Sequence, residues 1–182
     1  MNEFKNPWTT KTIESVYDNS WIEVEHHEVI TPAGTEGIYG KVKMKNLAIA
    51  VIPLDEELNT WLVGQYRYTI GSYSWELPMG GGPHGIDPLE SAKRELKEET
   101  GILAKEWKFL MKIHTSNCIT DETGLVYVAK ELTFGETSFD DTEQIKIRKL
   151  PFKKVVEMVE NGEITDSITV GAVLLLSREY DQ

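Results

Sequence analysis

Apolar and polar positions predict strands along the first third of the chain. Residues 11–30 alternate between the two kinds, which predicts one or two strands with Trp21, Val24 and Val29 as packing residues. Residues 39–54 pass from alternation into the continuous apolar run LAIAVIPL. Such a run predicts a buried central strand, because both of its faces are apolar.

The rest of the chain is predicted to mix further strands with three helices. The stretch 60–68 predicts a strand, whereas WELPMGGGPHG (75–85) predicts a loop, because glycine and proline disfavour both regular structures. One helix, three strands and two short helices are predicted to follow: a helix within 87–100, strands within 105–116, 123–132 and 142–150, and helices within 152–162 and 166–178. This order predicts the α/β class, with a mixed sheet sandwiched by helices.

The helix after the glycine-rich stretch has clear end signals. Asp87 is a good N-cap, Pro88 suits the first helical position, and Asp87 with Glu90 matches a capping box. Gly101 stands where a left-handed residue ends a helix. At about 100° per residue, three apolar side chains form a narrow core stripe: Leu89, Ala92 and Leu96.

Three carboxylates, Glu95, Glu98 and Glu99, cluster on the adjacent face of this helix. A solvated charged face is the ordinary explanation of such residues, but like charges this close destabilise a helix unless a cation binds. Arg94 lies four positions from both Glu98 and Glu90 and can pair with either. Crowded carboxylate oxygens also suit Mg²⁺ or Mn²⁺, with substrate phosphates completing the coordination.

The charge and the cysteine content indicate which binding partners and which cellular compartment to expect. A net charge of −11 over 182 residues disfavours electrostatic binding to nucleic acids and anionic membranes. The single cysteine, Cys118, permits no intramolecular disulfide and fits a reducing compartment. No secretory signal is evident in the first residues, and no apolar run is long enough to span a bilayer, so a cytoplasmic protein is expected.

RELKEETGI (94–102) resembles the second half of the Nudix box, and Gly80 supplies the first glycine of that motif at the right distance. GQYRY (64–68), WELPMG (75–80) and the C-terminal part resemble the ADP-ribose pyrophosphatase and nucleoside diphosphate sugar hydrolase-like branch of that family. The resemblance implies a Nudix α/β/α sandwich with a mixed sheet. It also implies an N-terminal β extension (1–44), expected to form a homodimer, before a hydrolase domain (45–182).

The resemblance further implies a pyrophosphatase that splits nucleoside diphosphate sugars with Mg²⁺ or Mn²⁺. The implied metal ligands are Glu95, Glu98, Glu99 and the Met79 carbonyl. Glu98 and Arg94 are also implied as catalytic residues, and Arg94 would hold the carboxylates in position. Neutralising the diphosphate and activating water are what such a reaction requires.

The other implied site residues come from loops and from the N-terminus. A general base is expected in SFDDTEQI (138–145), where Glu143 is the first choice and Asp141 the second; Asp121 and Glu122 form another acidic loop. Three residues are implied in substrate binding: Arg67 for a phosphate, Glu76 for the distal sugar, and Trp8 for stacking on the base. Trp21 is a second candidate for such stacking, but packing is the expected role of its side chain.

Two positions depart from the family pattern. Ile86 stands where the box has a glutamate that supports the arginine and the metal cluster, so weakened metal affinity is expected. HTSNCITDE (114–122) lacks the proline of the strictly ADP-ribose-selective group, which favours a broader substrate range. Two alternatives stay open: hydrolysis of another diphosphate, such as a dinucleotide or nucleoside triphosphate, and a non-catalytic nucleotide-sugar sensor.

Overall fold

A computed structural model describes residues 5–135 and 145–180 of the chain. It contains two compact units. The first comprises Met1–Asn46 together with Ser116–Glu122, and the second comprises Leu47–Thr115 together with Thr123–Gln182. Glu143 and Asp141 lie outside the described residues.

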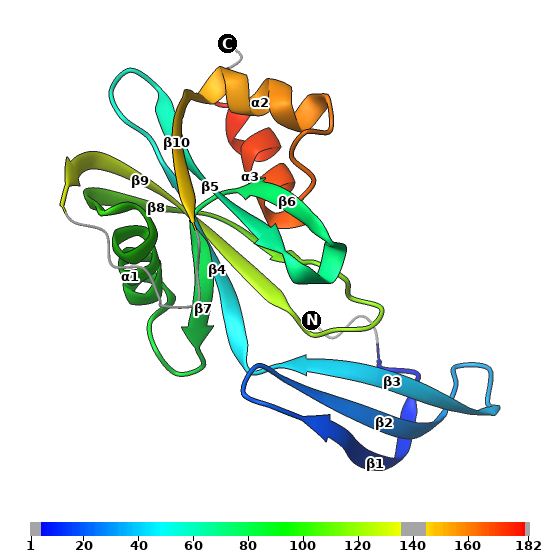
Figure 1. Ribbon diagram of the computed structural model, residues 1–182. Coiled ribbons are helices and arrows are strands. Elements are labelled where there is room, and N and C mark those ends of the chain that lie inside the picture. The colour runs from blue at the N-terminus through cyan, green and yellow to red at the C-terminus, as the bar shows by residue number, and fades with distance from the viewer. Residues whose placement is uncertain (1–4, 136–144, 181–182) are drawn as a thin grey trace. The chain divides into compact units, whose positions relative to one another are not determined.

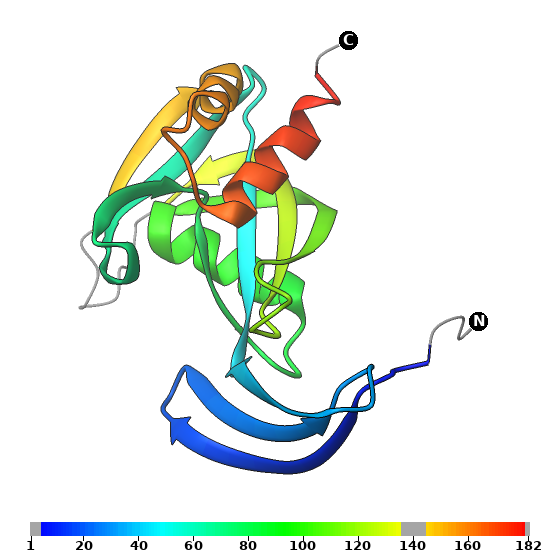
Figure 2. The same ribbon diagram turned by 90° about the vertical axis from the view of Figure 1, so that its right-hand side faces the viewer.

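The first unit is built on a three-stranded antiparallel sheet. Its strands are β1 (Thr9–Asp18), β2 (Ile22–Ile30) and β3 (Glu36–Met44), paired in that order and drawn as a curved ribbon in Figure 2. Val29 is buried as predicted, but the expected packing of Trp21 is wrong because that side chain is 70% exposed. Trp21 lies in the β1–β2 turn, before the alternation of β2 begins.

The second unit contains a four-stranded mixed sheet and a three-stranded antiparallel sheet. The four strands run in the order β7-β4-β9-β8, with β4 parallel to β9 and β8 antiparallel to it, and the other order is β10-β5-β6. The strand bounds are β4 (Asn46–Pro53), β5 (Asn59–Arg67), β6 (Ser72–Glu76), β7 (Met79–Pro83), β8 (Ile102–His114), β9 (Thr123–Phe134) and β10 (Lys146–Pro151).

Helices cover both faces of the mixed sheet, as Figure 1 shows for α1 (Pro88–Thr100) on one side and α2 (Phe152–Glu160) with α3 (Ser167–Ser177) on the other. A short 3₁₀ turn, η1 (Tyr68–Ile70), joins β5 to β6. Because strand side chains alternate between faces, β4 contributes to two cores. Ile49 and Val51 pack on the α1 side, whereas Ala50 and Ile52 pack on the side of α2 and α3. The predicted α/β/α sandwich with a mixed sheet is thereby confirmed.

One local prediction is wrong, because WELPMGGGPHG contains the end of β6 and the whole of β7 rather than a loop. Tertiary packing overrides the weak strand propensity of glycine here. A Cβ at Gly80 would lie 2.3 Å from the Glu95 carboxyl carbon, and one at Gly82 would lie 2.6 Å from Ile49. The missing side chains therefore let β7 lie close to α1 and to β4.

Within the described residues, no helix has both the length and the apolar character needed to cross a bilayer.

Candidate active site

The helix α1 has the ends that its sequence predicts. The Asp87 carboxylate accepts a hydrogen bond from the Leu89 N–H at 3.0 Å, and Pro88 is the first helical residue. At the other end Gly101 adopts a left-handed φ of 70°, and its N–H donates to the Lys97 carbonyl at 2.8 Å. These caps fix the position of the acidic residues between them.

The acidic face of α1 combines buried and accessible carboxylates. Glu95 and Glu99 are buried, with 8% and 5% exposed, whereas the Glu98 side chain is 41% exposed. Burying a charged carboxylate is unfavourable unless cations or hydrogen-bond donors compensate it. The neighbours of Glu95 and Glu99 therefore decide what this face can do.

Arg94 supplies that compensation for two of the carboxylates. Its Nη2 lies 2.5 Å from Glu95, its Nη1 lies 2.7 Å from Glu98, and Nη2 also donates to the Gly81 carbonyl at 2.8 Å. Burial lowers the pKa of the Arg94 guanidinium, but the charges of Glu95 and Glu98 outweigh burial and raise it. Of the two partners predicted for Arg94, Glu98 is confirmed, whereas Glu90 pairs with Lys93 at 2.6 Å.

The backbone of β7 lies against the same face. The Met79 N–H donates to Glu99 Oε2 at 2.9 Å, and Gly80 passes so close to Glu95 that a Cβ there would meet the Glu95 carboxylate at 2.3 Å. The residue implied as a backbone metal ligand is thus next to one of the implied carboxylate ligands. The glycine at position 80 leaves the space of a Cβ to the Glu95 carboxylate, so a larger residue there would displace that carboxylate.

The oxygen atoms on the acidic face of α1 and on β7 are of the types that bind divalent cations. Carboxylate and carbonyl oxygens are the ligands of Mg²⁺, and the buried, closely supported Glu95 and Glu99 flank the accessible Glu98 on one helix. The carboxylates are engaged by Arg94 and Met79, and in residues 5–135 and 145–180 no three acidic, histidine or cysteine side chains already converge as a metal cluster. The residues present fit such an ion by their chemistry.

Arg67 and Glu76, both implied in substrate binding, form an ion pair with each other. Arg67 Nε donates to Glu76 Oε1 at 3.0 Å and to Oε2 at 3.2 Å, and Nη2 donates to Oε2 as well. Glu76 is 4% exposed, whereas the Arg67 side chain is 38% exposed. The hydrogen bonds that Arg67 donates to Glu76 raise the pKa of the guanidinium, and burial lowers it by less, while the charges of Glu76, Asp166 and Glu99 raise it further.

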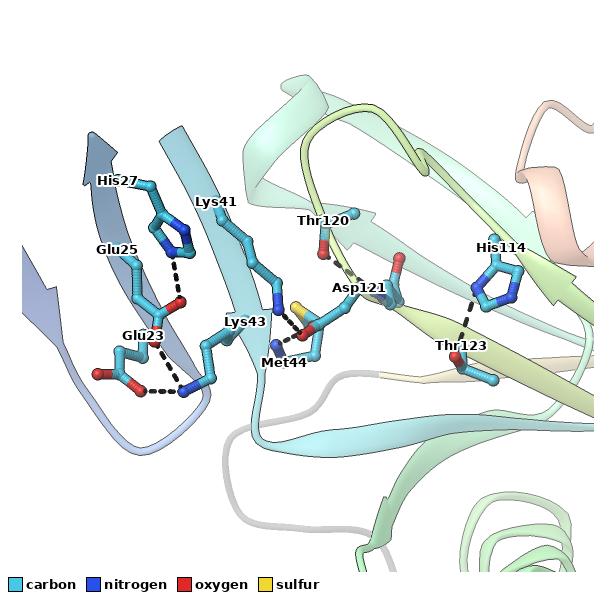
Figure 3. Close-up of polar contacts among 11 residues, drawn as sticks. Glu23, Glu25, His27, Lys41, Lys43, Met44, His114, Thr120, Asp121 and Thr123 are labelled. Carbon is cyan, nitrogen blue, oxygen red and sulfur yellow. Dashed lines mark hydrogen bonds and ion pairs between the residues drawn. The ribbon is translucent and has the colours of Figure 1, made fainter. Parts of the chain in front are cut away.

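Trp8 and the Asp121 loop belong to the first unit. Trp8 packs edge-on against Tyr39 with ring centroids 5.5 Å apart and stays 39% exposed, and its stacking on a base stays a prediction. Asp121 forms an ion pair with Lys41 at 2.8 Å and accepts the Met44 N–H at 2.9 Å (Figure 3). Burial raises the pKa of the Asp121 carboxyl, but these donors outweigh it and lower the pKa. This carboxylate connects the loop to β3.

Ile86, which replaces the expected glutamate, lies in the turn between β7 and α1. Its side chain is 54% exposed, and its N–H donates to the Pro83 carbonyl at 3.2 Å. An exposed isoleucine in a turn leaves room for substrate, solvent or a longer polar side chain. The carbonyl of Gly81 and the carboxylates of Glu95 and Glu98 provide the partners of Arg94.

Two residues that support the site, Asp166 and Thr169, are not among the site residues predicted from the sequence. Asp166 caps α3 by accepting the Thr169 N–H at 2.7 Å, and the buried Thr169 Oγ1 accepts the Leu77 N–H at 3.1 Å. Leu77 follows Glu76 directly, so the start of α3 holds the segment between β6 and β7. Asp166 stands at the start of the helix predicted within 166–178, and aspartate is a favoured N-cap residue, a signal that assigns this capping role from sequence.

Comparison with known proteins gives two adjacent family matches. The model of the NUDIX domain matches residues 44–166. The model of the nucleoside diphosphate sugar hydrolase N-terminal domain matches residues 8–42. Together they account for most of both units.

Similar proteins cover nearly the whole chain. The chain is 29% identical to an ADP-ribose pyrophosphatase of Mycobacterium tuberculosis, covering 93% of this chain and 83% of that protein. It is 31% identical to a methanol dehydrogenase activator of Bacillus methanolicus, covering 92% and 91%. The crystal structure of an ADP compounds hydrolase superposes with a TM-score of 0.84 at 23% identity, covering 95% of this chain and 93% of the other, which shows a shared fold.

Proposed function

The chain belongs to the Nudix family, and from that membership we propose that it is a metal-dependent pyrophosphatase of nucleoside diphosphate sugars. It would hydrolyse a compound such as ADP-ribose to a nucleoside monophosphate and a sugar phosphate. The observation that carries this proposal is the acidic face of α1, with Arg94 between Glu95 and Glu98 and the β7 backbone against Glu95 and Glu99. The match of residues 8–42 to the N-terminal domain of nucleoside diphosphate sugar hydrolases supports the substrate class.

We infer that Glu95, Glu98, Glu99 and the Met79 carbonyl hold the cation, Mg²⁺ or Mn²⁺. When bound, such an ion neutralises the charge of the diphosphate and makes water a better nucleophile. Arg94 fixes the directions of the Glu95 and Glu98 carboxylates, and the Met79 N–H fixes that of Glu99. These contacts orient the carboxylates in advance, which lowers the cost of ordering them when the cation binds.

The reaction adds water across one phosphorus–oxygen bond. The water oxygen bonds to one phosphorus, the bond from that phosphorus to the bridging oxygen breaks, and the proton of the water passes to a base. We propose Glu143 as that base, with Asp141 as the second choice. Arg67, whose side chain is 38% exposed, would bind a phosphate of the substrate.

A substrate panel tests the proposed class. The protein is incubated with Mg²⁺ and, separately, ADP-ribose, other nucleotide sugars, a dinucleotide and a nucleoside triphosphate. Added phosphatase then reports newly exposed phosphomonoesters. Cleavage of several nucleotide sugars, abolished in Glu98→Gln, is the expected result. Preferred cleavage of the dinucleotide or the triphosphate would replace the substrate class with the alternative one.

Ile86 favours a second candidate, a nucleotide-sugar sensor without turnover. In that case no compound of the panel would be cleaved, although nucleotide sugars would still raise the melting temperature. The three glutamates and Arg94, all present on α1, favour the enzyme.

We also propose a homodimer formed through the first unit, because its strands and the turn between β1 and β2 expose large apolar side chains. Four residues of the strands are more than half exposed, Ile13, Val16, Tyr17 and Ile38, and so is Trp21 in the turn. Monomeric proteins rarely leave extended apolar surface open to water. The net charge of −11 supports the absence of nucleic-acid and membrane partners, and the free Cys118 suits a cytoplasmic protein.

A further inference from the structure

The Arg67–Glu76 ion pair is a bidentate contact across the β5–β6 hairpin. Strand pairing places Val63 opposite Glu76 and Ser72 opposite Arg67, so the arginine side chain extends along the hairpin to reach the carboxylate. Nε and Nη2 both donate, and both carboxylate oxygens accept. Bidentate arginine–carboxylate pairs fix the plane of the guanidinium as well as its position.

The two partners differ in what they leave available to a ligand. The Glu76 side chain is 5% exposed and both of its oxygens accept from Arg67, so a sugar hydroxyl has little access to it. The Arg67 side chain is 38% exposed, and in the described ranges 5–135 and 145–180 its Nη1 has no acceptor. The edge of the pair that can bind a ligand is therefore the guanidinium edge at Nη1.

The surrounding elements hold this pair in place. The residue after Glu76, Leu77, donates its N–H to the buried Thr169 Oγ1 of α3 at 3.1 Å. Three residues after Glu76, Met79 donates its N–H to Glu99 of α1 at 2.9 Å. The segment that carries Glu76 therefore continues directly onto the acidic face of α1, which would process the diphosphate, and the charge of Glu99 is among those that raise the pKa of the Arg67 guanidinium.

We propose that Glu76 is a positioning residue, which holds Arg67 with its Nη1 edge open to a phosphoryl oxygen of the substrate, and that it does not contact the distal sugar. This rests on the proposed function. It assigns to the buried carboxylate a role different from the sugar contact that the family resemblance implies. The Glu76 pair fixes the plane of the guanidinium, so less side-chain freedom is lost when its remaining N–H donors bind a phosphate.

Kinetics on two substrates with different distal sugars test the assignment. Wild type, Glu76→Gln, Arg67→Ala and the double variant are compared on ADP-ribose and ADP-glucose with Mg²⁺. We expect Glu76→Gln to lower kcat/KM about 10- to 100-fold, mainly through KM and by the same factor for both sugars. In the Arg67→Ala background, Glu76→Gln should cause no further loss, because the residue that it positions is already absent.

Two results would overturn the proposal. One is a loss in Glu76→Gln that differs between the two sugars, as a direct sugar contact requires. The other is a double variant in which the two losses multiply. The matched control is Glu157→Gln, which removes a carboxylate paired with Lys154 at 3.1 Å on the exposed face of α2 and should leave kcat/KM unchanged.

Folding and function are separated by two additional measurements. Melting temperatures identify variants that fail to fold, and if Glu76→Gln is one of them, Arg67→Lys takes its place. Lysine keeps the positive charge but lacks the planar guanidinium, so Arg67→Lys should lower kcat/KM by the same factor for both sugars. If wild type cleaves neither compound, the proposed function fails. The dissociation constant of ADP-ribose is then measured by calorimetry for the same four proteins, and the positioning role predicts that Glu76→Gln weakens binding in wild type but not in Arg67→Ala.

Discussion

Arg94 contacts two of the three carboxylates on the acidic face of α1, although the glutamate expected at position 86 is an isoleucine. Ile86→Glu should lower the Mg²⁺ concentration for half-maximal turnover, by up to about tenfold. A carboxylate there would share Arg94, which leaves Glu98 more available to the cation. The side chain is 54% exposed, so the substitution does not disturb the core.

The measurement is turnover as a function of Mg²⁺ concentration. Ile119→Glu is the control, because that isoleucine is 52% exposed in the loop of the first unit and should leave the Mg²⁺ dependence unchanged. An unchanged or larger Mg²⁺ requirement in Ile86→Glu would show that position 86 does not act on the carboxylates.

Asp55 makes stability depend on pH. Burial raises the pKa of its carboxyl, but the ion pair with Lys149 at 2.8 Å and hydrogen bonds from Asn59 outweigh it and lower the pKa to about 2. A carboxyl with a lowered native pKa stabilises the fold above its unfolded value of 3.8, and this stabilisation is lost as the pH falls through about 2.

Asp55→Asn should therefore lower the free energy of unfolding by about 1–2 kcal/mol at neutral pH. The difference from wild type should shrink as the pH is lowered below about 4. Urea denaturation of both proteins across that range measures it. A difference that stays constant down to about pH 3 would mean that the charge of Asp55 contributes nothing.

The packing of β7 against α1 and β4 allows effects on activity and on stability to be measured separately, through Gly80 and Gly82. A Cβ at Gly80 would meet the far end of the Glu95 side chain at 2.3 Å, and that flexible carboxylate can move aside. Gly80→Ala should therefore lower kcat by about tenfold or more, as loss of a positioned carboxylate does, with a small change in melting temperature. A Cβ at Gly82 meets the buried Ile49 at 2.6 Å, and Gly82→Ala should cost about 1–3 kcal/mol of stability through overpacking.

Gly40→Ala is the matched control, because nothing lies within 4 Å of a Cβ at that position. Melting temperatures and kcat of the three variants measure both effects together. If Gly80→Ala kept full activity, the position of the Glu95 carboxylate would not matter for turnover, and the proposal that Glu95 is a metal ligand would be contradicted.

Helices and strands could be predicted from the sequence where nearby residues alone determine them. Asp87, Pro88 and Gly101 define α1 by their own chemistry, and the run within β4 reveals its burial. The strand β7 could not be predicted, because its glycines are favoured by contacts with Glu95 and Ile49 from other elements. The ion pair of Arg67 with Glu76 was missed for the same reason, since it depends on the pairing of β5 with β6.

For the molecule as a whole, the exposed apolar side chains of the first unit bear on assembly. Trp21 and Ile38 are 70% and 72% exposed, and a homodimer would remove such surface from water. Sedimentation at micromolar concentration should give twice the mass of the 20.7 kDa chain. Trp21→Ser should shift the distribution toward monomer, whereas Leu58→Ser, a 40% exposed residue of the second unit, should not. A stable wild-type monomer at that concentration would contradict the proposed dimer.

Hydrolysis of a nucleoside diphosphate sugar should depend both on a divalent cation and on the carboxylates of α1 that would hold it. The most direct measurement is chromatographic analysis of ADP-ribose incubated with wild type and Glu98→Gln, with Mg²⁺ or with EDTA. We expect AMP and ribose 5-phosphate in equal amounts from wild type with Mg²⁺, and unchanged ADP-ribose in the other three samples. Unchanged ADP-ribose in all four, or products that form equally with EDTA or with Glu98→Gln, would contradict this expectation.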